Sequence, residues 1–254
     1  MQSLKSIHLF GVKVTTDSKK NILKYIEESL ENGGQTVKIY TPNPEIIMHA
    51  RSHPEFMDTL NEANIALPDG IGIGIASFLC GKGNIPRISG TDFIYDLLNH
   101  LTGVKNSSVK TLKNPIKIGL FGGKPGVAEK VANCLQKKYS GITIPLATDH
   151  ILEEDLKEKK IDILFVALGF PKQEKWISEN IDKSSVKVGM GVGGAFDFIA
   201  GEIPRAPNFL RKAGFEWLFR LVVQPWRIKR QLALISFLLL TLRESLRRGS
   251  KKFS

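Results

Sequence analysis

Short runs of β-branched residues alternate with helical patterns along the chain, and this alternation limits the folds that it can adopt. The runs that we interpret as strands are Thr36–Tyr40, Asn64–Leu67, Ile116–Phe121, Ile142–Pro145, Ile161–Ala167 and Val186–Met190. Helical patterns cover 44–51, 71–80, 91–101 and 125–139, and others begin near 153 and 172. Strands that alternate with helices form a largely parallel sheet covered by helices. We therefore predict an α/β fold.

The positive charge of the chain is concentrated near its C-terminus. The net charge is +11, and residues 205–254 hold twelve Lys and Arg against two acids, Glu216 and Glu244. Two prolines in the segment 203–208 (IPRAPN) precede this basic region. We predict a core over residues 1–202 and a basic helical appendage over residues 203–254. Nucleic acid, anionic lipid and a polyanionic substrate are the partners that such a segment can meet.

The composition of the appendage favours a membrane surface over nucleic acid. Its longest uncharged run, Gln231–Leu242, has twelve residues and is flanked by arginines. A membrane-crossing helix needs roughly 20 apolar residues. An apolar run with Trp217, Trp226 and neighbouring arginines is typical of a helix that lies among lipid headgroups. We predict contact with an anionic membrane and none with nucleic acid; packing of a C-terminal helix on the core is the alternative.

Glycines follow several predicted strands. Gly122 and Gly123 come after one strand, and Gly191 and Gly193 come after the last. In parallel sheets, ligands bind outside the carboxyl ends of the strands, where glycine lets the backbone approach a phosphate closely. The set of loops predicts a ligand that carries a diphosphate, although each loop alone could be a tight turn.

One alternative is a dinucleotide site, because Gly189, Gly191 and Gly194 match the spacing G-x-G-x-x-G. That site also needs a second strand that ends in an acidic residue about 20 positions further on. The sequence there, RAPNFLRKAGFEWLF, has a helical pattern and arginines instead. An NAD-binding oxidoreductase is therefore the less favoured interpretation.

No pattern in the chain is typical of a metal site. The cysteines, Cys80 and Cys134, are far apart, which fits a reducing cytoplasm and neither a disulfide nor a zinc site. His49 and His53 lack a third ligand. The D-x-D triplet with which many transferases bind a metal does not occur. We predict neither a metal nor a cofactor.

Four segments together resemble the bacterial N-acetylmannosaminyltransferase family of teichoic-acid linkage units, enterobacterial common antigen and capsular polysaccharides. The segments are TPNPEIIMHAR (41–51), LPDGIGI with RISGTDF (67–73 and 87–93), GFPKQEKWI (169–177) and GVGGAFDFIAGEIPRAPNFLRKAGFEWLFRLVVQPWRIKRQ (191–231). The resemblance implies a Rossmann-like core, self-association and an appendage that completes the site. It also implies inverting transfer from a UDP-N-acetylhexosamine to undecaprenyl-diphosphate-linked GlcNAc.

The resemblance implies a role for Asp69 as the catalytic base. An inverting transfer needs a base for the acceptor hydroxyl and a group that stabilises the departing diphosphate. Pro68-Asp69-Gly70 is also an ordinary turn sequence. Without a bound metal, the second task would fall to cationic side chains.

Further residues match family motifs that line the site. Thr41 and Asn43 could orient a sugar or the base, or cap the next helix. Arg87 and Asp92 could bracket the donor, with helix capping as the alternative for Asp92. Gln173 is carried over as a pocket residue. Asp197 could accept the uracil N3–H, or could be another carboxylate at a helix start.

Arg220, Arg227 and Arg230 are spaced by seven and three residues. Within a helix both spacings return to nearly the same face, although Pro225 is expected to begin a new helix between the first two. Guanidinium groups on one side of a helix suit a diphosphate, either of UDP or of the lipid carrier. Lipid headgroups are the alternative ligand.

We therefore predict a metal-independent, inverting glycosyltransferase on the cytoplasmic face of the cell membrane. Its donor would be UDP-ManNAc, with N-acetylmannosaminuronic acid and glucose as alternative sugars. A non-catalytic nucleotide-sugar-binding membrane scaffold is the alternative from another class.

Overall fold

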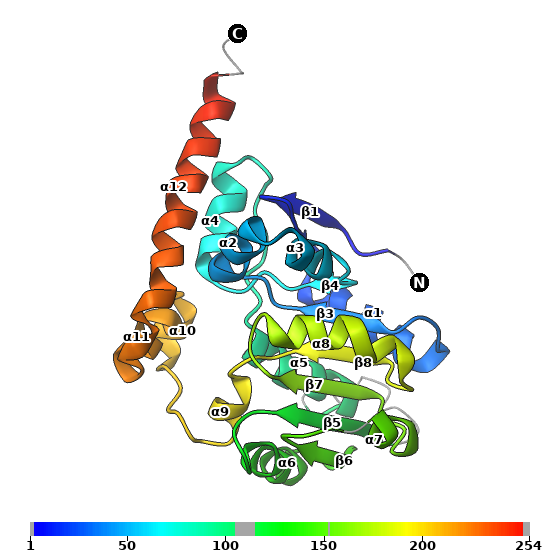
Figure 1. The fold of residues 1–254 in the computed structure, drawn as a ribbon. Helices are drawn as coiled ribbons and strands as arrows, with labels where there is room; N and C mark the ends of the chain where they lie inside the picture. Colours follow the sequence, from blue (N-terminus) through cyan, green and yellow to red (C-terminus); the bar gives the residue numbers. More distant parts are fainter. Residues whose placement is uncertain (1–2, 105–114, 152, 251–254) are drawn as a thin grey trace.

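The computed structural model describes residues 3–104, 115–151 and 153–250, which form a six-stranded sheet in the order β4-β3-β8-β7-β5-β6 (Figure 1). Every neighbouring pair in this sheet is parallel. The strands are β3 (Val37–Tyr40), β4 (Ile65–Ala66), β5 (Ile116–Gly122), β6 (Ile142–Thr148), β7 (Ile163–Ala167) and β8 (Val188–Gly191). Each predicted strand is present, and the α/β, Rossmann-like fold class is confirmed.

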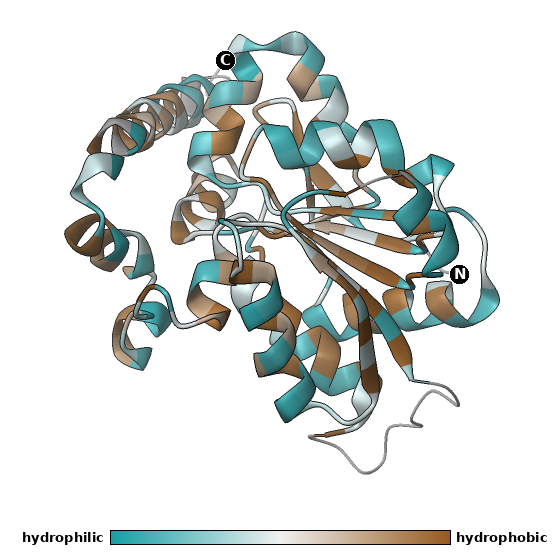
Figure 2. Cartoon of the chain, turned by 60° about the horizontal axis from the view of Figure 1, so that its bottom comes forward, coloured by the Kyte–Doolittle hydropathy of each residue, from teal (hydrophilic) through white to brown (hydrophobic). Residues whose placement is uncertain are grey.

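Helices cover both faces of the sheet, because its central strands are apolar on both sides. All of β7 (ILFVA) is buried, as parallel strands between two helical layers require. In Figure 2 the strands are largely brown, and teal covers much of the helices around them. One apolar core joins the sheet to α1 (Lys19–Asn32), α5 (Gly90–Thr102), α6 (Val127–Lys138) and α9 (Ala195–Ile199). The other joins it to α2 (Pro44–Ser52), α3 (Pro54–Asn61), α4 (Ile71–Leu79), α7 (Glu153–Glu158) and α8 (Lys172–Asn180).

The strand order contains a reversal that brings distant loops together. The step from β3 to β4 leads to one edge of the sheet, and the step from β5 to β6 leads to the other. Strands β7 and β8 then fill the centre, with β8 beside β3. Ligands of open α/β sheets bind at such reversals, beyond the carboxyl ends of the strands. The loops after β3, β4, β7 and β8 therefore share one candidate site.

An antiparallel hairpin, β1 (Ser6–Leu9) with β2 (Val12–Thr15), precedes the sheet and was not predicted. It packs against the edge strand β4. The Ala66 backbone N–H donates to Thr15 Oγ1 over 2.9 Å, and Lys13 Nζ donates to the Ala63 carbonyl over 2.7 Å. The hairpin thereby covers part of an edge that would otherwise expose unpaired backbone groups.

The C-terminal segment forms α10 (Asn208–Lys212), α11 (Glu216–Val223), the 3-10 turn η2 (Pro225–Arg227) and the long helix α12 (Ile228–Ser250). In Figure 1, α12 runs alongside α4 and away from the sheet. Phe237 and Thr241 on its inner face are buried, and the Phe237 ring meets the edge of Phe10 at 5.4 Å between centroids. The predicted helical appendage is thus present. No helix in the described part of the chain is both long and apolar enough to span a membrane.

We predict that Phe237→Ala lowers the free energy of unfolding by about 3 kcal/mol, because it opens a cavity under α12. Urea denaturation followed by circular dichroism measures the change. Leu239→Ala is the control, since Leu239 lies on the same helix and is 62% exposed. That control should change stability by less than about 0.5 kcal/mol. Equal effects of the two substitutions would contradict the docking of α12 through Phe237.

Candidate active site

Asp69 lies three residues after the end of β4, at the carboxyl ends of the strands where the candidate site lies. Its backbone N–H donates to the Pro42 carbonyl over 3.0 Å, which joins the loops after β3 and β4. Gly70 has a φ of +86°, so the chain turns sharply and α4 begins at the next residue. The Asp69 carboxyl is therefore held at the base of a fixed turn.

The environment of Asp69 suits a group that exchanges a proton near neutral pH. Burial raises the pKa of its carboxyl to about 6; Arg87 opposes this shift and Glu216 adds to it. Hydrogen bonds from the backbone amides of Gly90 and Gly70 also act to lower the pKa. A carboxylate with a pKa close to the working pH can act as a general base.

The loop after β3 supports the Asp69 loop. Asn43 caps α2, because its Oδ1 accepts the Ile46 backbone N–H over 2.9 Å. Thr41 does not take the capping position. It is buried, and a Cβ on Gly90 would lie 3.1 Å from Thr41 Cγ2. Thr41 thus packs against the backbone whose amide reaches Asp69.

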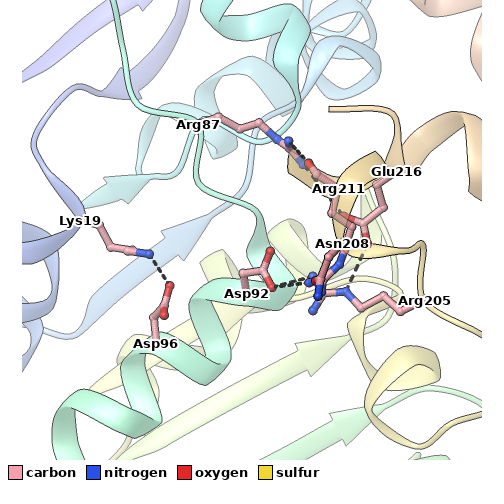
Figure 3. A network of polar contacts seen from close by, with 8 residues as sticks. All are labelled: Lys19, Arg87, Asp92, Asp96, Arg205, Asn208, Arg211 and Glu216. Carbon is pink, nitrogen blue, oxygen red and sulfur yellow. Dashed lines mark hydrogen bonds and ion pairs between the residues drawn. The ribbon is translucent and has the colours of Figure 1, made fainter. Parts of the chain in front are cut away.

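Asp92 pairs with arginines of the C-terminal segment (Figure 3). Its Oδ1 lies 2.8 Å from Arg205 Nη2 and 3.2 Å from Arg211 Nη1. Asp92 occupies the first turn of α5, where the N-cap residue is Ser89, so the capping alternative for Asp92 is wrong. The position of Asp92 links the core to the appendage.

Arg87 is held by the same segment. Its Nη1 donates to the Arg211 carbonyl over 2.6 Å, and its Nη2 lies 4.0 Å from Glu216 Oε2. Glu216 Oε1 in turn accepts from Arg205 Nε over 3.3 Å (Figure 3). The sequence alone predicted no role for Arg205, Arg211 and Glu216. The available signal was Glu216 itself, an acid within a strongly basic segment.

Arg220 reaches from α11 to the loop between β8 and α9. A Cβ on Gly194 would lie 2.1 Å from Arg220 Nη2, so only glycine leaves room for the guanidinium. The guanidinium carbon lies 4.8 Å from the centre of the Phe198 ring. Burial lowers the pKa of Arg220, while Asp197 favours its charge and Arg230 opposes it. Asp197 is therefore near this arginine as well as near the glycine loop.

Arg220, Arg227 and Arg230, which the spacing predicted to share a face, lie close enough to affect one another. Burial, together with the charges of Arg220 and Arg230, lowers the pKa of Arg227 to about 10. Arg230 Nε pairs with Glu45 Oε1 at 2.5 Å, and its guanidinium carbon lies 5.7 Å from the centre of the Phe170 ring. Such a concentration of guanidinium groups is suited to a diphosphate.

Gln173 lies beneath the glycine loop after β8. It is buried, and its Oε1 accepts the Gly193 backbone N–H over 2.8 Å. A Cβ on Gly191 would lie 2.9 Å from Gln173 Nε2. Gln173 therefore supports the loop from below, rather than standing only as part of a pocket wall.

Close backbone packing explains the glycines after β5. Gly122 has a φ of +98°, and a Cβ there would lie 2.9 Å from the Ala167 carbonyl. Gly123 has a φ of +88°, and its N–H donates to the Ala167 carbonyl over 3.0 Å. These contacts draw the ends of β5 and β7 together, whether or not a ligand also approaches them.

The dinucleotide alternative is wrong. The described chain after α9 forms α10 and α11, where that site needs a strand ending in an acid. Each glycine of the spacing faces protein instead, since a Cβ on Gly189 would lie 2.6 Å from Ile181 Cδ1. Across 3–104, 115–151 and 153–250, no group of three or more His, Cys, Asp or Glu side chains is placed to hold a metal ion.

A carboxyl with a raised pKa and an arginine cluster lie at the switch point of the parallel sheet. Glycosyl transfer from a nucleotide sugar needs a base and cationic groups of this kind. The chain belongs to the glycosyl transferase WecG/TagA/CpsF family, whose family model matches residues 7–251. It is a glycosyltransferase.

Relatives of known activity cover most of the chain. It is 34% identical over 242 residues to the N-acetylglucosaminyldiphosphoundecaprenol N-acetyl-beta-D-mannosaminyltransferase of Bacillus subtilis, covering 93% of this chain and 91% of the relative. It is 33% identical over 231 residues to the enzyme of that name from Staphylococcus aureus (strain MRSA252), covering 88% and 87%. The corresponding enzyme of Bacillus spizizenii is 29% identical over 220 residues, covering 84% and 82%.

We predict that Asp69→Asn stabilises the fold at pH 8 and not at pH 3. Below the ordinary pKa of 3.8 the carboxyl is neutral in the folded and unfolded states, so it adds nothing. Between pH 3.8 and about 6 the unfolded chain loses this proton while the folded protein keeps it, so the carboxyl increasingly destabilises the fold, and the full effect is present above pH 6. The difference between the folded and the ordinary pKa corresponds to at most about 3 kcal/mol of the free energy of unfolding. Urea denaturation at both pH values measures it; no gain at pH 8 would contradict the raised pKa.

We also predict that Gly194→Ala reduces turnover at least tenfold while the protein stays folded, because the new methyl group displaces the flexible Arg220 guanidinium. Steady-state kinetics and a thermal melt measure the two effects. Gly74→Ala is the matched control, since a Cβ there makes only ordinary contact, 3.9 Å from the Ile85 carbonyl. Unchanged turnover of Gly194→Ala would show that the Arg220 position is not needed.

Proposed function

We propose that the chain transfers N-acetylmannosamine from UDP-ManNAc to undecaprenyl-diphosphate-linked GlcNAc, with inversion at the anomeric carbon. The names of the three relatives support this acceptor and this sugar. The observation that carries the proposal is the placement of a base and a cation at the carboxyl ends of the strands: Asp69 follows β4, and the Arg220 guanidinium lies against Gly194 after β8, on the other side of β3. An inverting transfer needs these two functions on opposite sides of one sugar.

In this reaction Asp69 takes the proton of the acceptor hydroxyl. The hydroxyl oxygen forms the new bond to the anomeric carbon as the bond to the UDP oxygen breaks. The electron pair of that bond passes to the diphosphate, and Arg220 and Arg227 stabilise the added charge. Attack from the side opposite UDP inverts the configuration. We assign Arg230 to the outer part of the same cluster, since Glu45 already pairs with it.

The remaining candidate residues take supporting or donor-binding roles in this proposal. Asp197 accepts the uracil N3–H, and the backbone of Gly191 and Gly193, which Gln173 supports, lies against the donor. Asn43 fixes the loop after β3, as its capping bond supports. We infer that Asp92 acts mainly through Arg205 and Arg211, because both of them pair with it.

We further propose that the appendage rests on the anionic inner face of the cell membrane, so that the enzyme is peripheral and cytoplasmic. Its outer surface exposes large apolar side chains, among them Val222 and Trp226 at 72% and Leu246 at 75%. Arginines lie between these side chains, which suits anionic headgroups. Self-association, which the family resemblance implies, is part of the same proposal.

The test is UDP release after the full-length protein is mixed with UDP-ManNAc and a short-chain GlcNAc-diphosphate lipid. We expect release only with both substrates, no loss in EDTA, and slower release with UDP-N-acetylmannosaminuronic acid or UDP-glucose. Asp69→Ala should lower turnover at least about a thousandfold and retain UDP affinity. Arg220→Ala should weaken UDP binding. Transfer at the normal rate by Asp69→Ala would refute the assignment of the base.

A further inference from the structure

Glu174 is a buried carboxyl that the proposed chemistry does not use. It lies in α8 with none of its surface exposed, and its Oε2 has no hydrogen-bond partner. Burial raises the pKa of this carboxyl to about 7. A buried polar group without full hydrogen bonding costs stability, and an apolar side chain of similar size would not. Packing therefore does not explain why a carboxyl occupies this position.

The hydrogen-bond partner of Glu174 indicates the role of this carboxyl. Gln173 Nε2 donates to Glu174 Oε1 over 2.9 Å, and Gln173 Oε1 accepts the Gly193 N–H over 2.8 Å. An amide side chain has one donating end and one accepting end. An acceptor at Glu174 therefore selects the orientation in which the Gln173 oxygen faces Gly193. With Glu174 absent, rotation of the amide by 180° would turn its NH2 group toward the Gly193 N–H.

The loop that this arrangement holds is the one beneath Arg220. Gln173 Nε2 lies so near Gly191 that a Cβ there would be 2.9 Å from it, while Arg220 packs on Gly194. α8 also contacts β8 directly. The stretch Gly191–Gly193 is thus held by Gln173 of α8, and Arg220 of α11 lies against the next residue, Gly194.

We propose that Glu174 is a positioning residue, which fixes the Gln173 amide and through it the β8–α9 backbone on which the donor diphosphate rests. The nature of the ligand rests on the proposed function. The positioning of the loop by Glu174 and Gln173 does not depend on the proposed function, because all the contacts that hold the loop lie within the protein.

The test compares Glu174→Met, Gln173→Leu, the double variant and Glu174→Gln in the full-length protein. We expect Glu174→Met to raise the amide hydrogen-exchange rate of Gly193 about tenfold in the absence of ligand, and to weaken UDP binding about tenfold. Its melting temperature should not fall, because a costly buried group is removed. Glu174→Gln keeps an acceptor oxygen, so its Gly193 exchange rate and its UDP affinity should stay close to those of the unmodified protein. The double variant should lose no more Gly193 protection and no more UDP affinity than Gln173→Leu alone, since both substitutions act through one hydrogen bond.

Glu179→Met is the matched control, because Glu179 lies on the same helix and is exposed; it should change neither exchange nor UDP binding. Unchanged Gly193 exchange in Glu174→Met would overturn the positioning role, as would additive losses in the double variant. A lower melting temperature with normal exchange would mean a role in packing alone. If the unmodified protein failed to bind UDP, the proposed function would fail, and hydrogen exchange would still decide the role of Glu174.

Discussion

Three guanidinium groups held close together repel one another, and the arrangement of the C-terminal segment depends on how the protein offsets that repulsion. The effect is visible in Arg227, whose pKa is lowered to about 10 by burial and by its two neighbours. Glu45 pairs with Arg230, and the Gln224 side-chain oxygen accepts from Arg227 and Arg220 over 2.9 and 3.3 Å. These partners offset only part of the charge. An anionic ligand would supply the rest, and its binding would therefore tighten the contact between appendage and core.

The ion pairs in Figure 3 join the same appendage to the core. Glu216 belongs to the appendage, yet it raises the pKa of Asp69 in the core and lies 4.0 Å from Arg87, whose charge acts in the opposite direction. If the appendage moved away from the core, Glu216 would no longer favour the protonated form of Asp69. The proton affinity of Asp69 and the position of the arginines depend on the same docked segment.

The strand pattern was sufficient to predict the sheet, because its strands are short, apolar and separated by helices with clear starts. The β1–β2 hairpin was missed because its position depends on contacts with β4 that are distant in the sequence, such as the hydrogen bond between Ala66 and Thr15. For the site, the sequence placed the arginines on one side but could not show that Asp92 pairs with Arg205 and Arg211. Those residues are more than a hundred positions apart, so only the fold brings them together.

The glycines show most clearly how far a motif can be interpreted without a structure. Gly189, Gly191 and Gly194 have the spacing of a dinucleotide fingerprint, yet each makes room for a different protein side chain: Ile181, Gln173 and Arg220. A glycine pattern records where a Cβ is not tolerated, and it does not record what occupies the space. Here the last of those occupants is a cation from the appendage. The loop after β8 is consequently shaped to receive the C-terminal segment, and a phosphate group would meet the loop and Arg220 together.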